Sequence, residues 1–197
     1  MNISIFRSLL LASACSLAIL SGCSDKPEAN TPPASTPAVS GTAPSTRADT
    51  AATDAASPPY EATLAQGIDF SKTGYPSFLA DMSGVSNAET WGRWTDAKLG
   101  AEAKFRFKQT LPQQFKLALE VKDFYGINAG QNIVVRVGEK QQEFMFDSAD
   151  KTQRVELTFS DVGTTNTIEI IAPKHTEPTA TDSRMMGVGL VSLRILP

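Results

Sequence analysis

Apolar and polar residues alternate through much of the second half of the chain. Within 115–121, the residues Phe115, Leu117, Leu119 and Val121 alternate with lysine, alanine and glutamate. A period of two is typical of a β-strand that buries one face and exposes the other. The same pattern predicts strands at 105–107, 115–121, 133–137, 142–146, 155–159, 168–170 and 187–196.

The last of these strands carries a prediction of orientation. Val191, Leu193 and Ile195 alternate with Ser192 and Arg194. Since successive side chains of a strand point to opposite faces, we expect the three apolar residues on the buried face.

Helical patterns are nearly missing from the same part of the sequence. Phe78–Met82 is expected to form one short helical turn, ended by Ser83 and Gly84. No amphipathic segment of ordinary helix length separates the strands, which argues against a parallel sheet with crossover helices. The pattern therefore predicts an all-β domain over 66–197, folded as an antiparallel β-sandwich.

The N-terminus has the features of an export signal. A positively charged start, Met1–Arg7, precedes an apolar run that is too short to span a membrane. The run ends in Leu20–Cys23, which resembles the lipobox of bacterial lipoproteins. We therefore expect a signal peptide at 1–22 and a lipid on Cys23; the alternative is an ordinary signal peptide with a chance cysteine.

The residues after Cys23 predict where the chain is held. Ser24 follows the cysteine and aspartate comes one place later, at Asp25. The resemblance to lipoprotein sorting signals implies an outer-membrane anchor that faces the periplasm of the cell envelope. Residues 23–65 are rich in Pro, Ala, Thr and Ser, so we expect a disordered linker between the anchor and the domain.

Composition excludes several function classes. The formal net charge is -3 and no Lys/Arg cluster occurs, which argues against a nucleic-acid partner. Both cysteines, Cys15 and Cys23, lie in the first segment, and His175 is the only histidine. The usual three or four N/S ligands of a zinc site are therefore missing from the predicted domain, and we expect neither metal nor cofactor.

The stretch Glu89–Asp96 contains both tryptophans, with an arginine between them. Trp91, Arg93 and Trp94 could form a groove in which a glycan ring stacks, with Tyr125 and Asn128 at its rim. Alternatively, the tryptophans fill the end of the sandwich core and the arginine is held in an ion pair. The second interpretation is favoured, because buried aromatics are core residues more often than ligand contacts.

Charged residues near this stretch and near the C-terminus suggest ion pairs. The candidate pairs are Arg93 with Asp182 and Glu89 with Arg184. A structural network of this kind would join the first strand to the last one, and it is preferred over a functional role because pairing is how proteins tolerate buried arginine.

Several motifs occur in an order that resembles a known family. They are Gly67–Phe70, Gly74–Pro76, Trp91–Thr95, Asn128–Gly130, Val137–Gly138 and Asp182–Leu190. Together they resemble an uncharacterised C-terminal accessory domain of bacterial phosphoglycerol transferases and membrane glycosyltransferases, enzymes of envelope glycans. The resemblance implies a jelly-roll sandwich of the galactose-binding kind and carries over no active site. Ile127 departs from it, since proline is usual there.

No catalytic constellation is identifiable. His175 is expected to be a solvated loop residue, without a nucleophile or an orienting partner. Asp147 and Asp150 could hold calcium, but a plain turn is preferred because calcium requires six or more oxygens.

These observations predict a non-enzymatic lipoprotein. Its domain would bind envelope carbohydrate or glycolipid. The alternative is a protein-interaction module that docks on an envelope glycosyl- or phosphoglycerol transferase.

Overall fold

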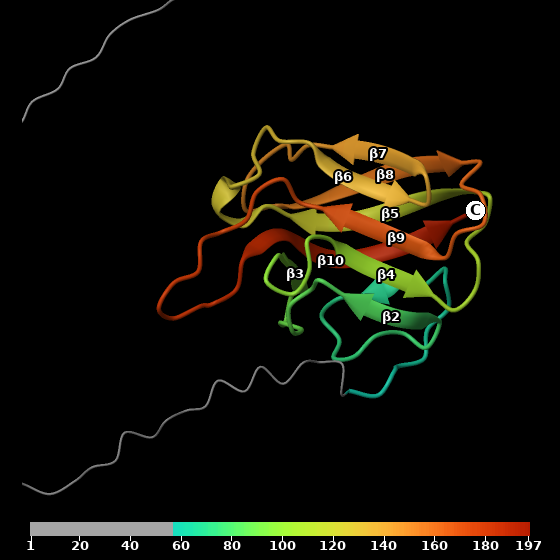
Figure 1. Ribbon diagram of the computed structural model, residues 1–197, viewed down its shortest axis with the longest axis horizontal. Helices are drawn as coiled ribbons and strands as arrows, with labels where there is room; N and C mark the ends of the chain where they lie inside the picture. Colours follow the sequence, from blue (N-terminus) through green and yellow to red (C-terminus); the bar gives the residue numbers. More distant parts are fainter. Residues whose placement is uncertain (1–56) are drawn as a thin grey trace, which may run out of the picture. The chain divides into compact units, whose positions relative to one another are not determined.

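Two antiparallel β-sheets pack face to face in the computed structural model, which describes residues 57–197 (Figure 1). The first, called the β10 sheet, contains β1 (Ile68–Asp69), β3 (Arg93–Asp96), β5 (Gln114–Lys122), β8 (Thr152–Ser160) and β10 (Met186–Leu196). The second, called the β9 sheet, contains β2 (Leu79–Ser83), β4 (Ala103–Phe107), β6 (Ile133–Val137), β7 (Lys140–Phe144) and β9 (Thr167–Ile171).

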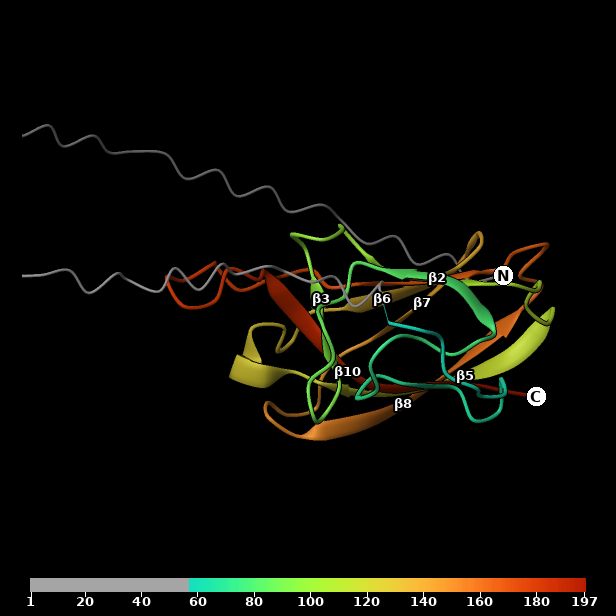
Figure 2. The same cartoon turned by 90° about the horizontal axis from the view of Figure 1, so that it is seen from below.

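The chain moves repeatedly from one sheet to the other. The β10 sheet has the order β1-β10-β5-β8, with β3 also paired to β10, and the β9 sheet has the order β2-β4-β9-β6-β7. From β4 to β10 every connection changes sheet except the β6–β7 hairpin. Figure 2 shows the two layers edge-on. The predicted all-β antiparallel sandwich of jelly-roll type is confirmed.

The hydrophobic core lies between the sheets. In β5 the alternating residues Phe115, Leu117, Leu119 and Val121 are each at most 1% exposed. Burial of an aliphatic or aromatic side chain contributes about 1.5–3 kcal/mol. Such residues from both sheets form one core cluster, so the core requires all the long strands.

The longer predicted strands correspond to β4 through β10. One placement differs, because β7 ends at Phe144 and not at Phe146. Phe146 is nevertheless buried, with its ring centroid 5.7 Å from that of Phe144. The alternation at 142–146 therefore predicts correctly that Phe144 and Phe146 are buried, but the hydrogen-bonded strand ends two residues earlier than predicted.

The prediction of a helical turn at Phe78–Met82 is wrong. Leu79–Ser83 forms strand β2 at the edge of the β9 sheet, paired with β4. Leu79 is buried, and Phe78 stacks on Phe107 with centroids 5.8 Å apart. Pairing with β4 and this packing determine the local structure, and neither can be read from a five-residue segment.

The predicted orientation of β10 is wrong at one residue. Leu190 and Leu193 are buried, whereas Val191 is only half-buried. The ladder with β5 shifts register between Leu190 and Ser192. The irregularity adds one residue to β10 at this point. The residues that face the core are therefore Leu190 and Leu193, and Val191 is not one of them.

The folded unit begins before residue 66. Tyr60 forms a bridge with Pro76, and its hydroxyl accepts a hydrogen bond from the Asp69 backbone N–H at 3.1 Å. The C-terminal end of the predicted linker therefore packs on the sandwich. The predicted signal peptide, Cys23 and the rest of the linker through residue 56 lie outside the described residues. Within 57–197, no helix has both the length and the apolar character needed to span a bilayer.

Candidate functional site

The Glu89–Trp94 segment folds as a tight hairpin at one end of the sandwich. Glu89 and Gly92 exchange backbone hydrogen bonds of 2.8 and 3.2 Å. Gly92 has φ +153°, and a Cβ at this position would lie 2.1 Å from the Leu190 carbonyl oxygen. Only glycine fits here, because β10 passes directly against the turn.

Arg93 is a buried structural residue. Its side chain is 1% exposed. The guanidinium donates to the carbonyl oxygens of Ser86 at 3.2 Å, Lys72 at 2.7 Å and Gly74 at 2.9 Å. Hydrogen bonds from a cation to carbonyls are stronger than neutral ones, so Arg93 joins β3 to the loop after β1.

Both tryptophans pack in an aromatic cluster with Phe124. Ring centroids are 5.2 Å apart for Trp91 and Trp94, 5.0 Å for Trp91 and Phe124, and 4.9 Å for Trp94 and Phe124. Trp94 is 5% exposed, whereas Trp91 is half-buried over Gly189 of β10. Lys122 lies over the rings of Trp91 and Phe124, at 5.1 and 5.2 Å. The cluster therefore closes the core and leaves one tryptophan partly accessible.

Arg184 connects this hairpin to the segment before β10. It contacts Glu89 at 2.6 Å and Asp182 at 2.6 Å. Glu89 also accepts a 2.8 Å hydrogen bond from the Trp91 indole N–H. Hydrogen bonds from Arg184 lower the pKa of the Asp182 carboxyl. Of the two ion pairs considered from the sequence, the structure contains Glu89 with Arg184. Arg93 contacts backbone carbonyl oxygens, and Asp182 is paired with Arg184.

The loop after β5 is built around two buried polar residues. Asn128 is fully buried and bonds to the Lys174 N–H, the Lys174 carbonyl and the Gly187 carbonyl, at 3.1, 3.2 and 3.3 Å. Its own N–H donates to Asp123 at 3.2 Å. Burial raises the pKa of the Asp123 carboxyl, the Asn128 N–H opposes that rise, and Asp150 adds to it. This pair fixes the loop to the β9–β10 connection, beside which Figure 1 places it.

The loop also exposes one aromatic side chain. Tyr125, in the short helical turn η2 (Phe124–Gly126), is 75% exposed and has φ +66°. Its N–H donates to the Asp150 carboxylate at 3.2 Å. A left-handed backbone conformation is uncommon for tyrosine, and here it accompanies a side chain that is exposed to solvent.

The proposed glycan groove does not fit three of its five residues. Arg93 and Asn128 are buried and hydrogen-bonded to backbone carbonyl oxygens, and Trp94 is buried in the aromatic cluster. Only Trp91 and Tyr125 retain accessible surface. Trp94 is buried in the aromatic cluster and Trp91 is half-buried, and neither belongs to the core cluster between the sheets.

His175 is less exposed than its loop position suggests. Its ring is half-buried beside Gly187, where an added Cβ would lie 3.0 Å from His175 Cδ2. Burial lowers the pKa of His175, and Asp96 partly offsets this effect. Asp150 bonds to the Tyr125 N–H, and the Asp147 N–H donates to Gln153 at 2.8 Å. In the part of the chain that the structure describes, no three His, Cys, Asp or Glu side chains are grouped to hold a metal ion.

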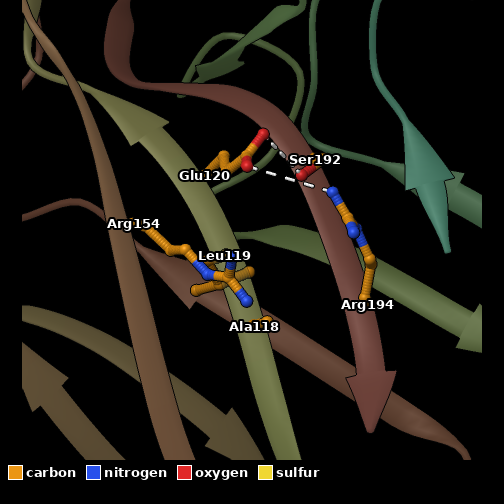
Figure 3. Close-up of a pocket in the computed structure, with 6 residues that line it drawn as sticks. All are labelled: Ala118, Leu119, Glu120, Arg154, Ser192 and Arg194. Carbon is orange, nitrogen blue, oxygen red and sulfur yellow. Dashed lines mark hydrogen bonds and ion pairs between the residues drawn. The ribbon is translucent and has the colours of Figure 1, made fainter. Parts of the chain in front are cut away.

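A second region, unmarked in the sequence, lies on the outer face of the β10 sheet. A shallow depression is lined by Ala118, Leu119, Glu120, Arg154, Ser192 and Arg194, and is called the two-arginine depression here (Figure 3). Glu120 accepts a hydrogen bond from Ser192 at 3.1 Å and lies 3.9 Å from Arg194. The residues come from three strands, so only the ladder register brings them together.

A larger, more apolar pocket lies beside β2 and β4. Its volume is about 270 Å³, and it is lined by Leu64, Ser77, Phe78, Phe107, Lys108, Gln109, Thr110 and Leu111. Leu64, at its rim, is 36% exposed. Its lining residues include no carboxylate or histidine.

Comparison with protein families and with known proteins identifies the family of this chain. Residues 54–197 match the family described as Domain of unknown function (DUF7024). The chain belongs to this family. Phosphoglycerol transferase I of Escherichia fergusonii is 32% identical over 140 residues, and the proteins of the same name from Escherichia coli O139:H28 and Shigella boydii serotype 18 are 33% identical.

In these relatives the match covers 67% of this chain but only 18% of the relative, in its C-terminal region. The chain therefore corresponds to an accessory domain of phosphoglycerol transferases, as the motifs predicted. A solved structure named BiXyn10A CBM1 APO aligns with a TM-score of 0.42 and 14% identity, over 69% of this chain and 99% of that one. At this score the likeness supports no functional comparison.

Proposed function

We propose that this protein is a non-enzymatic accessory module that binds an envelope glycan. The observation that supports this most is the match to the C-terminal region of phosphoglycerol transferase I, a small share of that enzyme. A domain of this kind is suited to holding the glycan on which such an enzyme acts.

The distribution of polar groups supports binding without turnover. Two side chains with shifted pKa values make structural contacts: Asp182 is paired with Arg184, and Asp123 accepts a hydrogen bond from the Asn128 N–H. Trp91 and Tyr125 retain surface for contact with a sugar ring.

Calorimetric titration of the purified full-length protein with a panel of envelope glucans tests the proposal. Binding of at least one glucan without change in its covalent structure is expected. Absence of heat for every member of the panel would contradict it. Trp91→Ala should weaken binding about tenfold, because loss of stacking costs about 1–1.5 kcal/mol.

We further propose that the N-terminus anchors the module to the outer membrane, facing the periplasm, through a lipid on Cys23. The lipobox-like Leu20–Cys23 supports this, and lipid chains supply about 0.8 kcal/mol per buried CH₂. Labelled palmitate should be incorporated by the wild type and not by Cys23→Ala. Equal labelling of both proteins would contradict the anchor.

A second candidate function is docking on an envelope glycosyl- or phosphoglycerol transferase. The apolar pocket around Phe78 and Phe107 favours it, because an exposed apolar surface of this kind is typical of interaction sites. Phe78→Ser should then abolish co-purification with a phosphoglycerol transferase and leave glucan titrations unchanged. The reverse result would favour the glycan-binding function.

A further inference from the structure

The pocket beside β2 and β4, called the Phe78 pocket here, lies far from the aromatic cluster. It borders Phe107, the last residue of β4, and the connection that leads from there to β5. Lys122, at the other end of β5, lies over the Trp91 ring at 5.1 Å. A nine-residue strand is about 25–30 Å long, so a ligand of this pocket is separate from a sugar that stacks on Trp91. Figure 1 shows the same separation, with β4 ending near the C-terminus and β3 on the opposite side.

The base of the Phe78 pocket is apolar. Phe107 and Leu111 are 2% and 3% exposed, and Phe78 stacks on Phe107. Leu64 adds an apolar wall at the rim. Aliphatic and aromatic side chains offer no hydrogen bonds to the hydroxyl groups of a sugar, so this base suits a hydrocarbon group.

The wall formed by Leu64 is held in place by the segment that leads into the domain. The Thr63 N–H donates to the Gln66 side-chain oxygen at 2.8 Å. Upstream, the Tyr60 carbonyl accepts a hydrogen bond of 2.7 Å from the Ser77 N–H. The pocket is therefore formed before a ligand arrives, which lowers the entropic cost of binding.

The polar side of the pocket is a single run of three residues, Lys108, Gln109 and Thr110. The Lys108 N–H donates to the Phe78 carbonyl at 3.0 Å, which holds the run against the apolar base. Within 57–197 the side chains of these three residues make no hydrogen bond or ion pair with the protein. Their donors are therefore available to the polar end of a ligand.

The charge on this side of the pocket is positive. Lys108 is the one charged residue among the described lining residues. Glu61 lies outside the lining and accepts a 3.0 Å hydrogen bond from the Ser77 hydroxyl. An anionic group is therefore favoured beside Lys108, where it gains a charge-assisted hydrogen bond.

Size distinguishes a single hydrocarbon chain from a larger partner. An apolar cavity of about 150 Å³ holds benzene, so a volume of about 270 Å³ holds about ten carbon atoms. Of the exposed large hydrophobic side chains of 57–197, only Leu64 lines the pocket. A stable protein interface covers about 800 Å² on each partner, whereas the apolar surface here is confined to the pocket itself. One inserted chain therefore fits better than a broad protein interface.

We infer that the Phe78 pocket binds a free alkyl carboxylate of about ten carbons, with the chain on Phe107 and Leu111 and the carboxylate beside Lys108. This inference goes beyond the proposed glycan-binding function, because it concerns the other end of the sandwich and another chemical class of ligand. It also gives the pocket an occupant different from the enzyme of the second candidate function.

Calorimetric titration of the purified full-length protein, without detergent, with hexanoate, octanoate, decanoate, dodecanoate and tetradecanoate tests the inference. Affinity should rise about fourfold for each added CH₂ as far as decanoate, because each methylene leaves water for the apolar base. Beyond decanoate it should stop rising, since further carbons find no room and remain in water. A continuous rise through tetradecanoate would overturn the inference, because it would indicate adsorption to the surface of the protein.

Two lysine variants test the position of the carboxylate. Lys108→Met should weaken decanoate binding about threefold and leave binding of decanol, which carries no charge, unchanged. Lys140→Met is the matched control, since Lys140 is an exposed lysine on β7, in the same sheet as β4. An equal loss in both variants would show a general charge effect and contradict the inference.

Two further outcomes separate this inference from the other proposals. Absence of binding for every alkyl carboxylate overturns it and leaves the glycan-binding function standing, since that function uses Trp91 and Tyr125. Loss of co-purification with a phosphoglycerol transferase in Phe78→Ser, without competition by decanoate in the wild type, would also overturn it, because a protein would then occupy the pocket.

Discussion

Arginine serves two different purposes at two places in this sandwich. At the loop end, Arg93 is buried against three carbonyl oxygens, and Arg184 is paired with two carboxylates. On the outer face of the β10 sheet, Arg154 and Arg194 are exposed and weakly paired. The first two arginines hold loops together, and the other two make only exposed contacts with Glu156 and Glu120.

The comparison shows that a conspicuous motif need not be the site of function. Trp91–Thr95 is marked in the sequence because bulky aromatics, glycine and arginine must fit one another at the end of the core. The residues of the depression are ordinary outward positions of strands. Their significance depends on which strands are neighbours.

Replacing Arg93 should have the largest effect on stability. Arg93→Ala removes the donor of three carbonyl contacts, two of them buried, so the free energy of unfolding should fall by about 3–5 kcal/mol. Arg194→Ala should change it by less than about 0.5 kcal/mol. Urea denaturation of both variants measures the difference, and similar losses would remove the distinction drawn above.

Gly92 tests how closely the hairpin is fitted to β10. Gly92→Ala would bring a Cβ to 2.1 Å from the Leu190 carbonyl oxygen, and a loss of about 2–4 kcal/mol is expected. Gly130→Ala is the control, because Gly130 also has positive φ, at +68°, but nothing lies within 4 Å of the added carbon. The control should lose only about 1–2 kcal/mol by thermal unfolding. An equal loss would mean that φ alone, and not the contact with β10, matters.

The Asp182–Arg184 pair should give the smallest effect and a pH dependence. The pKa of Asp182 is lowered in the folded state, so its stabilisation is present above the unfolded pKa of 3.8 and is lost as pH falls through the folded value. Asp182→Asn should cost about 0.5–1 kcal/mol at pH 7, because the pair is partly exposed. As the pH falls through the lowered pKa of Asp182, the variant and the wild type should converge in chemical denaturation. A constant difference across this range would contradict the assignment.

Most of the sandwich could be predicted because its long strands alternate strictly. Leu117 and Leu119 identify β5 without any knowledge of its neighbours. Strands β2 and β3 are short, and β3 is buried at every position, so neither shows a period of two. The irregularity in β10 depends on its pairing with β5 and leaves no local signal.

The contacts of the candidate sites also differ in whether they could be predicted from the sequence. The contact of Arg184 with Glu89 could be proposed from the spacing and charge of two marked motifs. The burial of Asn128 could not, because it depends on the β9–β10 connection folding over it. The approach of Arg154 and Arg194 to Ala118 joins strands separated by dozens of residues, and only the register of two ladders produces it.

Strand β10 is the interior member of its sheet, bonded to β1, β3 and β5, yet it follows all the other strands in the chain. Assembly of this sheet must therefore wait until synthesis has passed Leu196. Shorter nascent chains lack the element that joins both halves of the sheet, and non-local pairing of this kind is slow to form.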